Sequence, residues 1–321
     1  MTIILAIALL IGGGTSYVAQ NSLPGDVLYS VKVNLNEEVQ GFVAFGSEAK
    51  ARLSAGLAER RLEEAEKLAV DGKLTTETRA NIESRFEEHG KAFEEELKNI
   101  DSSESSTAIL EINSNFEASL KANEQILVGV ADKKESGRAE VESLLIKVRS
   151  RLSTTVKSRS DAEAKVSAGV GVDVKVAAEG KLKATENKIS EVKDFIAKTK
   201  SASNVNASAK AETRIRVAEE AVVRGKAELE ASSYGKAFAS FEEAMRIAQE
   251  AKLLVTGGAK INLDINLGGV GVGSGGGTTT NSGDGTSSGA SIKVESSTKI
   301  NSGNSSSGVS GDGKLKVGIG L

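Results

Sequence analysis

The pattern of hydrophobic and polar positions predicts a chain made mostly of amphipathic helices. Directly after residue 26, apolar side chains recur at intervals of three and four, as they do along one face of a helix. These positions are Leu28, Val31, Leu35, Val39 and Phe42. The spacing therefore predicts a helix that buries this stripe.

The same periodicity continues through two further helices. Ser47 is expected to cap the first of them, because its hydroxyl is a good acceptor for free backbone N–H groups. Asp71-Gly72 is expected to end that helix, and a third helix is expected from about Glu77 to Ile100 after a threonine cap. Together these elements predict a helical domain over residues 23–100.

Helical patterns resume after a serine-rich break and predict further antiparallel hairpins over residues 101–255. One insert differs, at residues 166–176, where valines alternate with other residues around Gly169 and Gly171. A period of two is typical of a strand or an extended loop. The predicted fold class is therefore mainly α, as elongated antiparallel helical hairpins or a bundle with one extended insert.

The last part of the chain, residues 256–321, changes abruptly to Gly, Ser, Thr and Asn. Such a segment buries too little apolar surface to offset its ordering entropy, so we expect a low-complexity, mostly disordered tail. Short alternating pieces within it are expected to be strand-like islands. They lie at residues 261–267, 292–294 and 315–321.

The first 22 residues are predicted to be a membrane anchor or a signal segment. Every residue from Ile3 to Ile11 is apolar, and no charged side chain precedes Asp26. The run is as short as a signal-peptide core, whereas a bilayer-spanning helix needs about 20 mostly apolar residues. Cleavage after Ala19 would place bulky Tyr17 where a small residue is preferred, which favours an uncleaved anchor. A buried N-terminal helix is the remaining alternative.

The anchor hypothesis predicts a single-pass protein of the cell membrane with its bulk outside the cytoplasm, or a secreted protein if the segment is cleaved. No Lys or Arg precedes Lys32, although such residues normally hold the inner end of an anchor in the cytoplasm. We therefore expect an upstream start that supplies the missing charge.

The residues around position 25 resemble a known family. The resemblance rests on a motif and on the run from Ala58 to Ala65. The motif residues are Leu23, Pro24, Gly25, Asp26, Leu28, Tyr29, Val31 and Lys32. They resemble the start of a bacterial domain of unknown function that follows an N-terminal membrane segment. The resemblance covers about residues 20–100 and implies an extracytoplasmic helical module, with a structural role for the motif and no assigned activity.

The composition excludes several kinds of core and of binding or catalytic site. Aromatic residues make up 3% and Trp is absent, so the core is expected to be thin. The net charge of −3 arises from 41 basic and 44 acidic side chains spread together, a balance that gives no field for collecting nucleic acid. The lack of cysteine excludes disulfides, thiolate zinc sites and cysteine nucleophiles.

No catalytic, cofactor-binding or metal-binding residue is predicted. The single histidine, His89, is expected on a solvated helix face. Acidic pairs such as Glu63-Glu64 and Glu87-Glu88 are expected to form solvated faces with nearby Lys and Arg, rather than a calcium site. Two glycine-rich stretches, at 271–276 and 308–314, match nucleotide-binding motifs in letters, but no helix pattern follows either one.

Two functions remain at this stage. The first is a membrane-tethered, non-enzymatic structural or interaction module, whose expected partners are the membrane and another envelope protein or polymer. The second is an envelope hydrolase, either metal-dependent or based on carboxylates alone, since the chain has almost no histidine and no cysteine. Convergence of two or more carboxylates in a closed pocket would favour the second.

Overall fold

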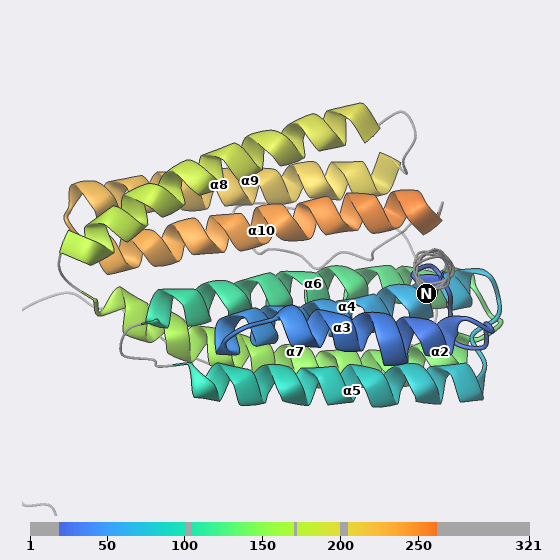
Figure 1. Ribbon diagram of the computed structural model, residues 1–321. Coiled ribbons are helices and arrows are strands. Elements are labelled where there is room, and N and C mark those ends of the chain that lie inside the picture. Colours follow the sequence, from blue (N-terminus) through green and yellow to red (C-terminus); the bar gives the residue numbers. More distant parts are fainter. Residues whose placement is uncertain (1–18, 101–104, 170–171, 200–204, 262–321) are drawn as a thin grey trace, which may run out of the picture. The chain divides into compact units, whose positions relative to one another are not determined.

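The computed structural model describes residues 19–100, 105–169, 172–199 and 205–261, which fall within one compact unit, Met1–Gly269. All regular elements in these residues are helices, so the prediction of a mainly α fold is confirmed (Figure 1). In chain order they are α2 (Tyr29–Val31), the π-helical turn η1 (Lys32–Asn36), α3 (Glu37–Val43), α4 (Ser47–Val70), α5 (Thr76–Asn99), α6 (Ser106–Lys133), α7 (Arg138–Ser167), α8 (Val172–Thr199), α9 (Val205–Glu230) and α10 (Tyr234–Ile261).

Short connections fold consecutive helices into antiparallel hairpins: α4 with α5, α6 with α7, and α9 with α10 (Figure 1). The first connection turns at Gly72, with a φ of 68°, and the second at Gly137, with a φ of 78°. Both values lie in the left-handed region that glycine adopts without steric cost. Thr75 caps α5, because its hydroxyl accepts from the backbone N–H of Thr78 while the Thr78 hydroxyl accepts from the backbone N–H of Thr75.

The first hydrophobic core lies between α4, α5, α6 and α7. Its largest members are Phe86, Phe93 and Phe116, and the rings of Phe93 and Phe116 lie 4.6 Å apart between centroids. Because α6 and α7 complete this core, the domain boundary expected near residue 100 falls inside it.

The second core lies between α8, α9 and α10, with contributions from the start of α6 and the end of α7. Phe241 of α10 is its largest fully buried side chain. Helix α10 also packs along α6, so the two cores meet along this helix pair.

A layer of buried charge separates the cores along that pair. Glu117 of α6 is 1% exposed and lies 3.1 Å from the guanidinium of Arg246 and 2.6 Å from that of Arg159. Burial alone would raise the pKa of Glu117, but Arg246, Lys121 and Arg159 together lower it below its ordinary value. Attraction to these cations therefore outweighs the cost of burying the carboxylate.

The extended insert predicted at residues 166–176 is wrong. Helix α7 continues through Ser167, and α8 begins at Val172. Valine lowers helix stability by only a few tenths of a kcal/mol, so packing against neighbouring helices outweighs its preference for strands. Of the residues between the two helices, the structure describes Ala168 and Gly169, and neither belongs to a helix.

The buried stripe predicted for the first helix is also wrong. Leu35, Val39 and Phe42 are exposed by 52%, 54% and 79%. The face of α2, η1 and α3 that meets the body instead carries Tyr29, Lys32, Val33 and Glu37, all of them buried. This segment therefore turns its polar face inward.

The ends of the chain extend past the described residues. Helix α10 continues to Ile261, so the helical part of the chain extends six residues past residue 255, where it was predicted to end. The predicted strand-like islands beyond it, the glycine-rich stretches and residues 1–18 of the expected anchor lie outside the described residues. Among the helices of the described part, none is long and apolar enough to cross a membrane.

Candidate functional site

The motif begins with a tight turn that directs the chain onto α4. The N–H of Asp26 donates to the carbonyl of Leu23 at 2.9 Å, and the carboxylate of Asp26 accepts from the N–H of Leu23 at 2.7 Å. Gly25 has a φ of 100°, as a type II turn with Pro24 before it requires. Pro24 and Gly25 therefore form the centre of this turn.

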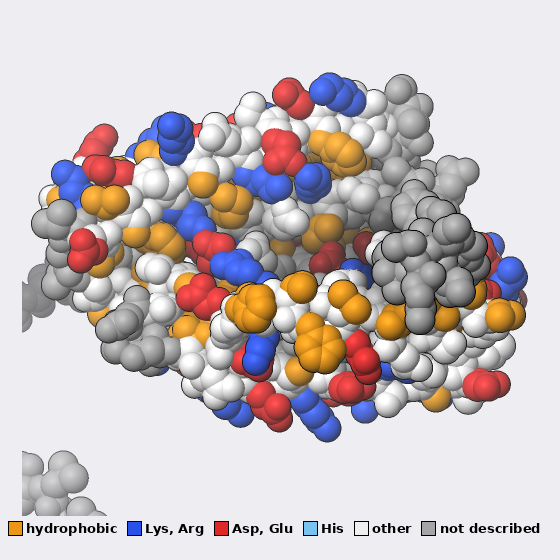
Figure 2. Space-filling view, viewed as in Figure 1, with side chains coloured by type: hydrophobic (Ala, Val, Ile, Leu, Met, Phe, Trp, Pro, Cys, Tyr) orange, Lys and Arg blue, Asp and Glu red, His pale blue; other side chains and the backbone are white. Residues whose placement is uncertain are grey.

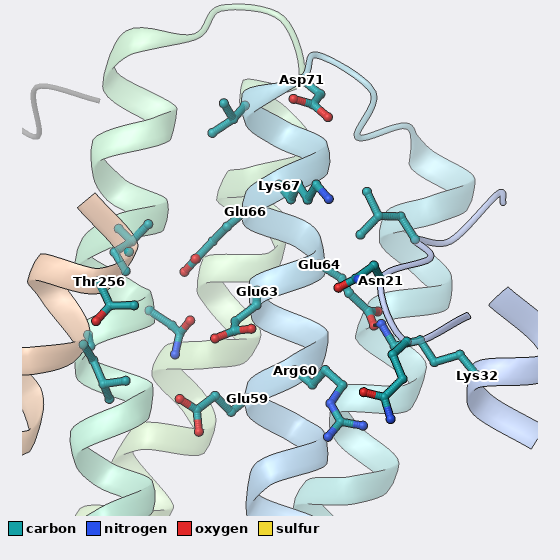
Figure 3. A pocket seen from close by; sticks show the side chains of 18 residues that line it. Asn21, Lys32, Glu59, Arg60, Glu63, Glu64, Glu66, Lys67, Asp71 and Thr256 are labelled. Atoms are coloured by element: carbon teal, nitrogen blue, oxygen red, sulfur yellow. Dashed lines mark hydrogen bonds and ion pairs between the residues drawn. The ribbon is translucent and has the colours of Figure 1, made fainter. Parts of the chain in front are cut away.

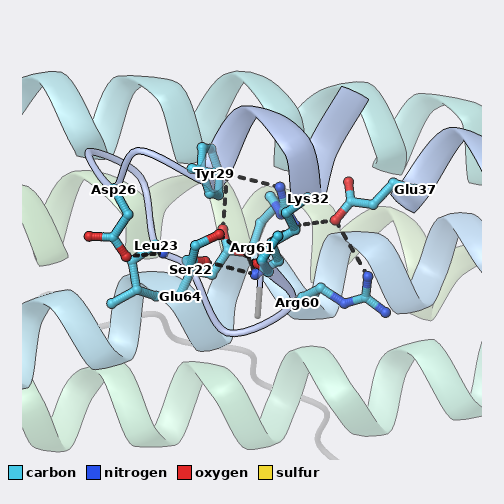
Figure 4. Close-up of polar contacts among 10 residues, drawn as sticks. Ser22, Leu23, Asp26, Tyr29, Lys32, Glu37, Arg60, Arg61 and Glu64 are labelled. Carbon is cyan, nitrogen blue, oxygen red and sulfur yellow. Dashed lines mark hydrogen bonds and ion pairs between the residues drawn. The ribbon is translucent and has the colours of Figure 1, made fainter. Parts of the chain in front are cut away.

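After this turn, Tyr29 and Lys32 reach the same carboxylate of α4, that of Glu64 (Figure 4). The Tyr29 hydroxyl donates to Oε2 at 3.0 Å, and the Lys32 ammonium donates to Oε1 at 2.5 Å. Lys32 also donates to the carbonyl of Ser22 at 3.1 Å. One lysine therefore joins the chain before the turn, the helix after it and α4.

Arg61 completes the cluster from the turn of α4 next to Glu64. Its guanidinium donates to the Tyr29 hydroxyl at 2.9 Å and to Glu37 at 2.6 Å, and it lies 3.0 Å from Glu64. Arg60 approaches Glu37 from the edge at 3.4 Å. We call Tyr29, Lys32, Glu37, Arg61 and Glu64 the clasp.

The π-helical turn explains how Lys32 and Glu37 share one face. In an α-helix, residues five apart point about 140° away from each other, because each residue turns the chain by about 100°. Here the N–H of Glu37 donates to the carbonyl of Lys32, a bond that spans five residues and widens the turn. The added residue brings both side chains onto α4.

All five clasp side chains are buried, with Arg61 fully so. Lys32 and Arg61 balance Glu37 and Glu64 in formal charge, so the buried group is neutral as a whole. Burial first, and the charge of Glu64 second, raise the pKa of Tyr29 well above its ordinary value. The hydroxyl therefore stays protonated and acts as a donor at neutral pH.

His89 of α5 lies close enough to the guanidinium groups of Arg60 and Arg61 on α4 for their charge to affect its pKa. Burial, followed by Arg61, Arg85 and Arg60, lowers the pKa of His89 to about 4. Its Nε2 is buried without a hydrogen-bond partner. The prediction of a solvated surface histidine is therefore wrong.

Beside the clasp lies a cavity of about 510 Å³, bordered by residues 20–23, by α4 and α6, and by the end of α10. Figure 3 shows Glu59, Glu63 and Glu66 on the side of α4 that faces Thr256. Arg60 and Glu64 project from the other side of α4, towards Lys32 (Figure 3). The cavity thus has an acidic wall next to the neutral clasp.

The acidic pairs of the sequence do not behave as simple solvated faces. Glu64 belongs to the clasp, while Glu87 and Glu94 of α5 both pair with Arg151 of α7, which also donates to the carbonyl of Gly90 at 3.2 Å. In the part of the chain that the structure describes, no three acidic or histidine side chains come close enough together to hold a metal ion.

The motif residues expected to be structural therefore include two members of the clasp, Tyr29 and Lys32. Sequence reasoning missed Glu37, Arg61 and Glu64, because it assigned charged residues to solvent. A signal was present for Arg61, since it lies between Ala58, Leu62 and Ala65 on the buried side of α4. A charged residue within an apolar face indicates a buried ion pair.

Residues 21–151 match a family described as a domain of unknown function (DUF5667). The matched range begins just before the turn and ends in the middle of α7, so it contains the clasp and most of the first core. It reaches further than the resemblance over residues 20–100. No match to this chain was found among the curated proteins or among the solved structures.

Proposed function

We propose that the chain is a non-enzymatic structural or interaction module, tethered to a cell membrane by its N-terminal apolar segment and folded outside the cytoplasm. The observation that carries this proposal is the clasp. It fastens the residues that follow the apolar segment to the middle of α4.

The fastening begins immediately after that segment. Ala19 is fully buried, and its carbonyl accepts from the Ser22 hydroxyl at 2.6 Å. The turn from Leu23 to Asp26 then leads to Tyr29 and Lys32 in the clasp. A tether joined in this way holds the helical body close to its anchor, whereas a flexible linker would let it drift away.

The chemistry of the clasp supports a structural role over a catalytic one. Each ionised group is bonded to an opposite charge, and the raised pKa of Tyr29 makes its hydroxyl a poor nucleophile at neutral pH. The charges therefore serve to fix the segment in place. The expected partner of the exposed surfaces is another envelope protein or a polymer.

Membrane fractionation of the full-length chain tests the tether. We expect wild-type protein to stay in the membrane pellet after an alkaline wash, with residues beyond Asp26 open to external protease. Ile7→Arg should move most of it to the soluble fraction, because arginine at the centre of a spanning helix costs about 2.5–3.5 kcal/mol.

Gln20→Arg is the matched control, because it adds the same charge just beyond the apolar run, at an exposed position. It should leave the distribution unchanged. Wild-type protein in the soluble fraction, or equal behaviour of the two variants, would contradict the proposal.

A carboxylate-based or metal-dependent hydrolase is the second candidate. The acidic wall of the cavity favours its carboxylate-based form, because no three acidic side chains of the described residues come close enough together to hold a metal ion. Titration calorimetry of the full chain with Ca²⁺, Mg²⁺ and Zn²⁺ tests its metal-dependent form. Saturable binding that Glu63→Gln abolishes would support that candidate, and binding that is unaffected by Glu63→Gln would count against this wall as the site.

A further inference from the structure

An exposed apolar stripe runs along the outer face of the segment that carries the clasp. Figure 2 shows hydrophobic side chains gathered over α3, in the view of Figure 1. The stripe, as we call it, consists of Val27 (93% exposed), Leu35 (52%), Val39 (54%), Phe42 (79%), Val43 (66%) and Phe45 (84%).

The stripe and the clasp lie on opposite faces of the same segment. Because Tyr29, Lys32 and Glu37 occupy the inner face, the apolar residues spaced at Leu35 and Val39 point outward, with the two phenylalanines beyond them. Ordinary amphipathic helices of soluble proteins have the opposite arrangement. A contiguous exposed apolar surface of this kind marks a site that binds another protein or a membrane.

We propose that the stripe lies in the interface of a phospholipid bilayer, where its side chains enter the boundary between headgroups and acyl chains. This inference rests on the proposed tether. The sequence places the stripe next to the apolar segment, since Val27 lies only eight positions after Ala19, where the described chain begins to pack. A tether fixed by the clasp keeps the stripe within reach of the membrane that holds the anchor.

The size of the stripe also favours a lipid surface over a second copy of the chain. Phe42 and Phe45 together expose roughly 250–400 Å², taking 150–250 Å² for a whole aromatic side chain. These two side chains alone therefore reach the size of the largest apolar patch of an ordinary monomer, about 300–600 Å². A stable dimer needs about 20–30 residues from each partner, whereas the stripe has only the six residues named above.

The charges around the stripe indicate how it would bind. No Lys or Arg occurs from Val33 to Ala49, whereas Glu38 is exposed beside the stripe. Interfacial helices that depend on anionic lipid carry basic residues on their polar face. Insertion of this stripe therefore depends on apolar burial, and neutral phosphatidylcholine should support it at least as well as anionic phosphatidylglycerol.

The absence of cysteine allows a direct test, because each introduced cysteine is a unique labelling site. Full-length Phe42→Cys and Val27→Cys are labelled with an environment-sensitive fluorophore and reconstituted in phosphatidylcholine vesicles. Val223→Cys is the matched control, since Val223 of α9 is an apolar residue that is 69% exposed on another helix.

We expect the protein to float with the vesicles, and we expect nitroxide-bearing lipid to quench both stripe probes at least twofold more than the Val223 probe. Iodide in the water should quench in the opposite order. Replacing a third of the lipid with phosphatidylglycerol should not increase the quenching by nitroxide.

The other outcomes separate this inference from the proposed tether. Floating protein whose three probes respond alike would overturn the stripe as a lipid contact and leave the tether intact. Protein that does not float would overturn both. Stripe probes shielded from lipid and iodide alike would overturn the lipid contact, and disulfide formation between Phe42→Cys chains would then identify a second copy as the occupant.

Discussion

Replacing Arg61 with methionine removes the cation of the clasp that contacts both buried carboxylates. Methionine has a similar length and fills most of the space, so the change acts chiefly through charge and hydrogen bonding. After it, Glu64 keeps the Lys32 ammonium at 2.5 Å and the Tyr29 hydroxyl at 3.0 Å. Glu37 keeps Arg60, which is 3.4 Å away and 37% exposed.

The magnitude follows from these remaining contacts. Removing one partner of a buried ion pair costs about 3–5 kcal/mol, because a charge is left in a poorly solvated place. Glu64 stays well compensated and Glu37 is compensated in part, so we expect a loss near the lower limit, about 3 kcal/mol. An exposed pair is worth only about 0–1 kcal/mol.

Urea unfolding of the full-length chain in mild detergent, followed by far-ultraviolet circular dichroism, measures this loss. Arg138→Met is the matched control, since Arg138 pairs with Glu142 at 3.0 Å and both side chains are about half exposed. The double variant Glu37→Gln/Arg61→Met should recover part of the stability, because it removes the orphaned carboxylate. If Arg61→Met and Arg138→Met unfold within about 1 kcal/mol of each other, the clasp does not hold the segment as we argue.

Three further predictions concern other parts of the fold. Folding lowers the pKa of His89 from 6.5 to about 4, so the unfolded state binds more protons than the folded state between these pH values. In urea, the free energy of unfolding should therefore be about 2 kcal/mol lower at pH 5 than at pH 7.5, and His89→Gln should remove most of that difference. Gly225→Ala should lower the melting temperature, since its Cβ would lie 2.4 Å from the Phe241 ring, whereas Gly180→Ala in an open part of α8 should raise it. Glu117→Gln should lower the free energy of unfolding by about 3 kcal/mol at neutral pH. Because folding lowers the pKa of Glu117, the difference in urea between the variant and wild type should shrink once acid protonates the carboxylate; a difference that stays constant down to low pH would contradict a stabilising role for the ionised carboxylate.

The helical character and most hairpins could be predicted, because they depend on local signals. Long runs with a period near 3.6 and turns at glycine identify α4 to α7 without knowledge of their neighbours. The prediction of a strand or extended loop at 166–176 is wrong, since four alternating valines are too few to distinguish a strand from the start of a helix. Packing against other helices decided that case.

The clasp could not be predicted, because a π-helical turn changes which residues share a face before and after positions 32–36. An uninterrupted period of 3.6 places Leu28, Val31, Leu35, Val39 and Phe42 on one helix face. The π-helical turn adds a residue at positions 32–36, and it rotates the following positions relative to the preceding ones. No residue in that turn has a side chain that marks it in a sequence. The burial of Lys32 and Glu37 then depends on Arg61 and Glu64, which lie more than 20 residues further along the chain.

The layer of charge between the two cores has a consequence for the order in which the chain folds during synthesis. The residues of the first core end at Val148, and N-terminal regions emerge from the ribosome first. Glu117 would be costly to bury alone. Lys121 on its own helix and Arg159 on α7 reach it before α10 is made, at 2.7 Å and 2.6 Å. The first bundle can therefore close as soon as α7 is complete, and Arg246 arrives later as a third cation on a carboxylate that is already neutralised.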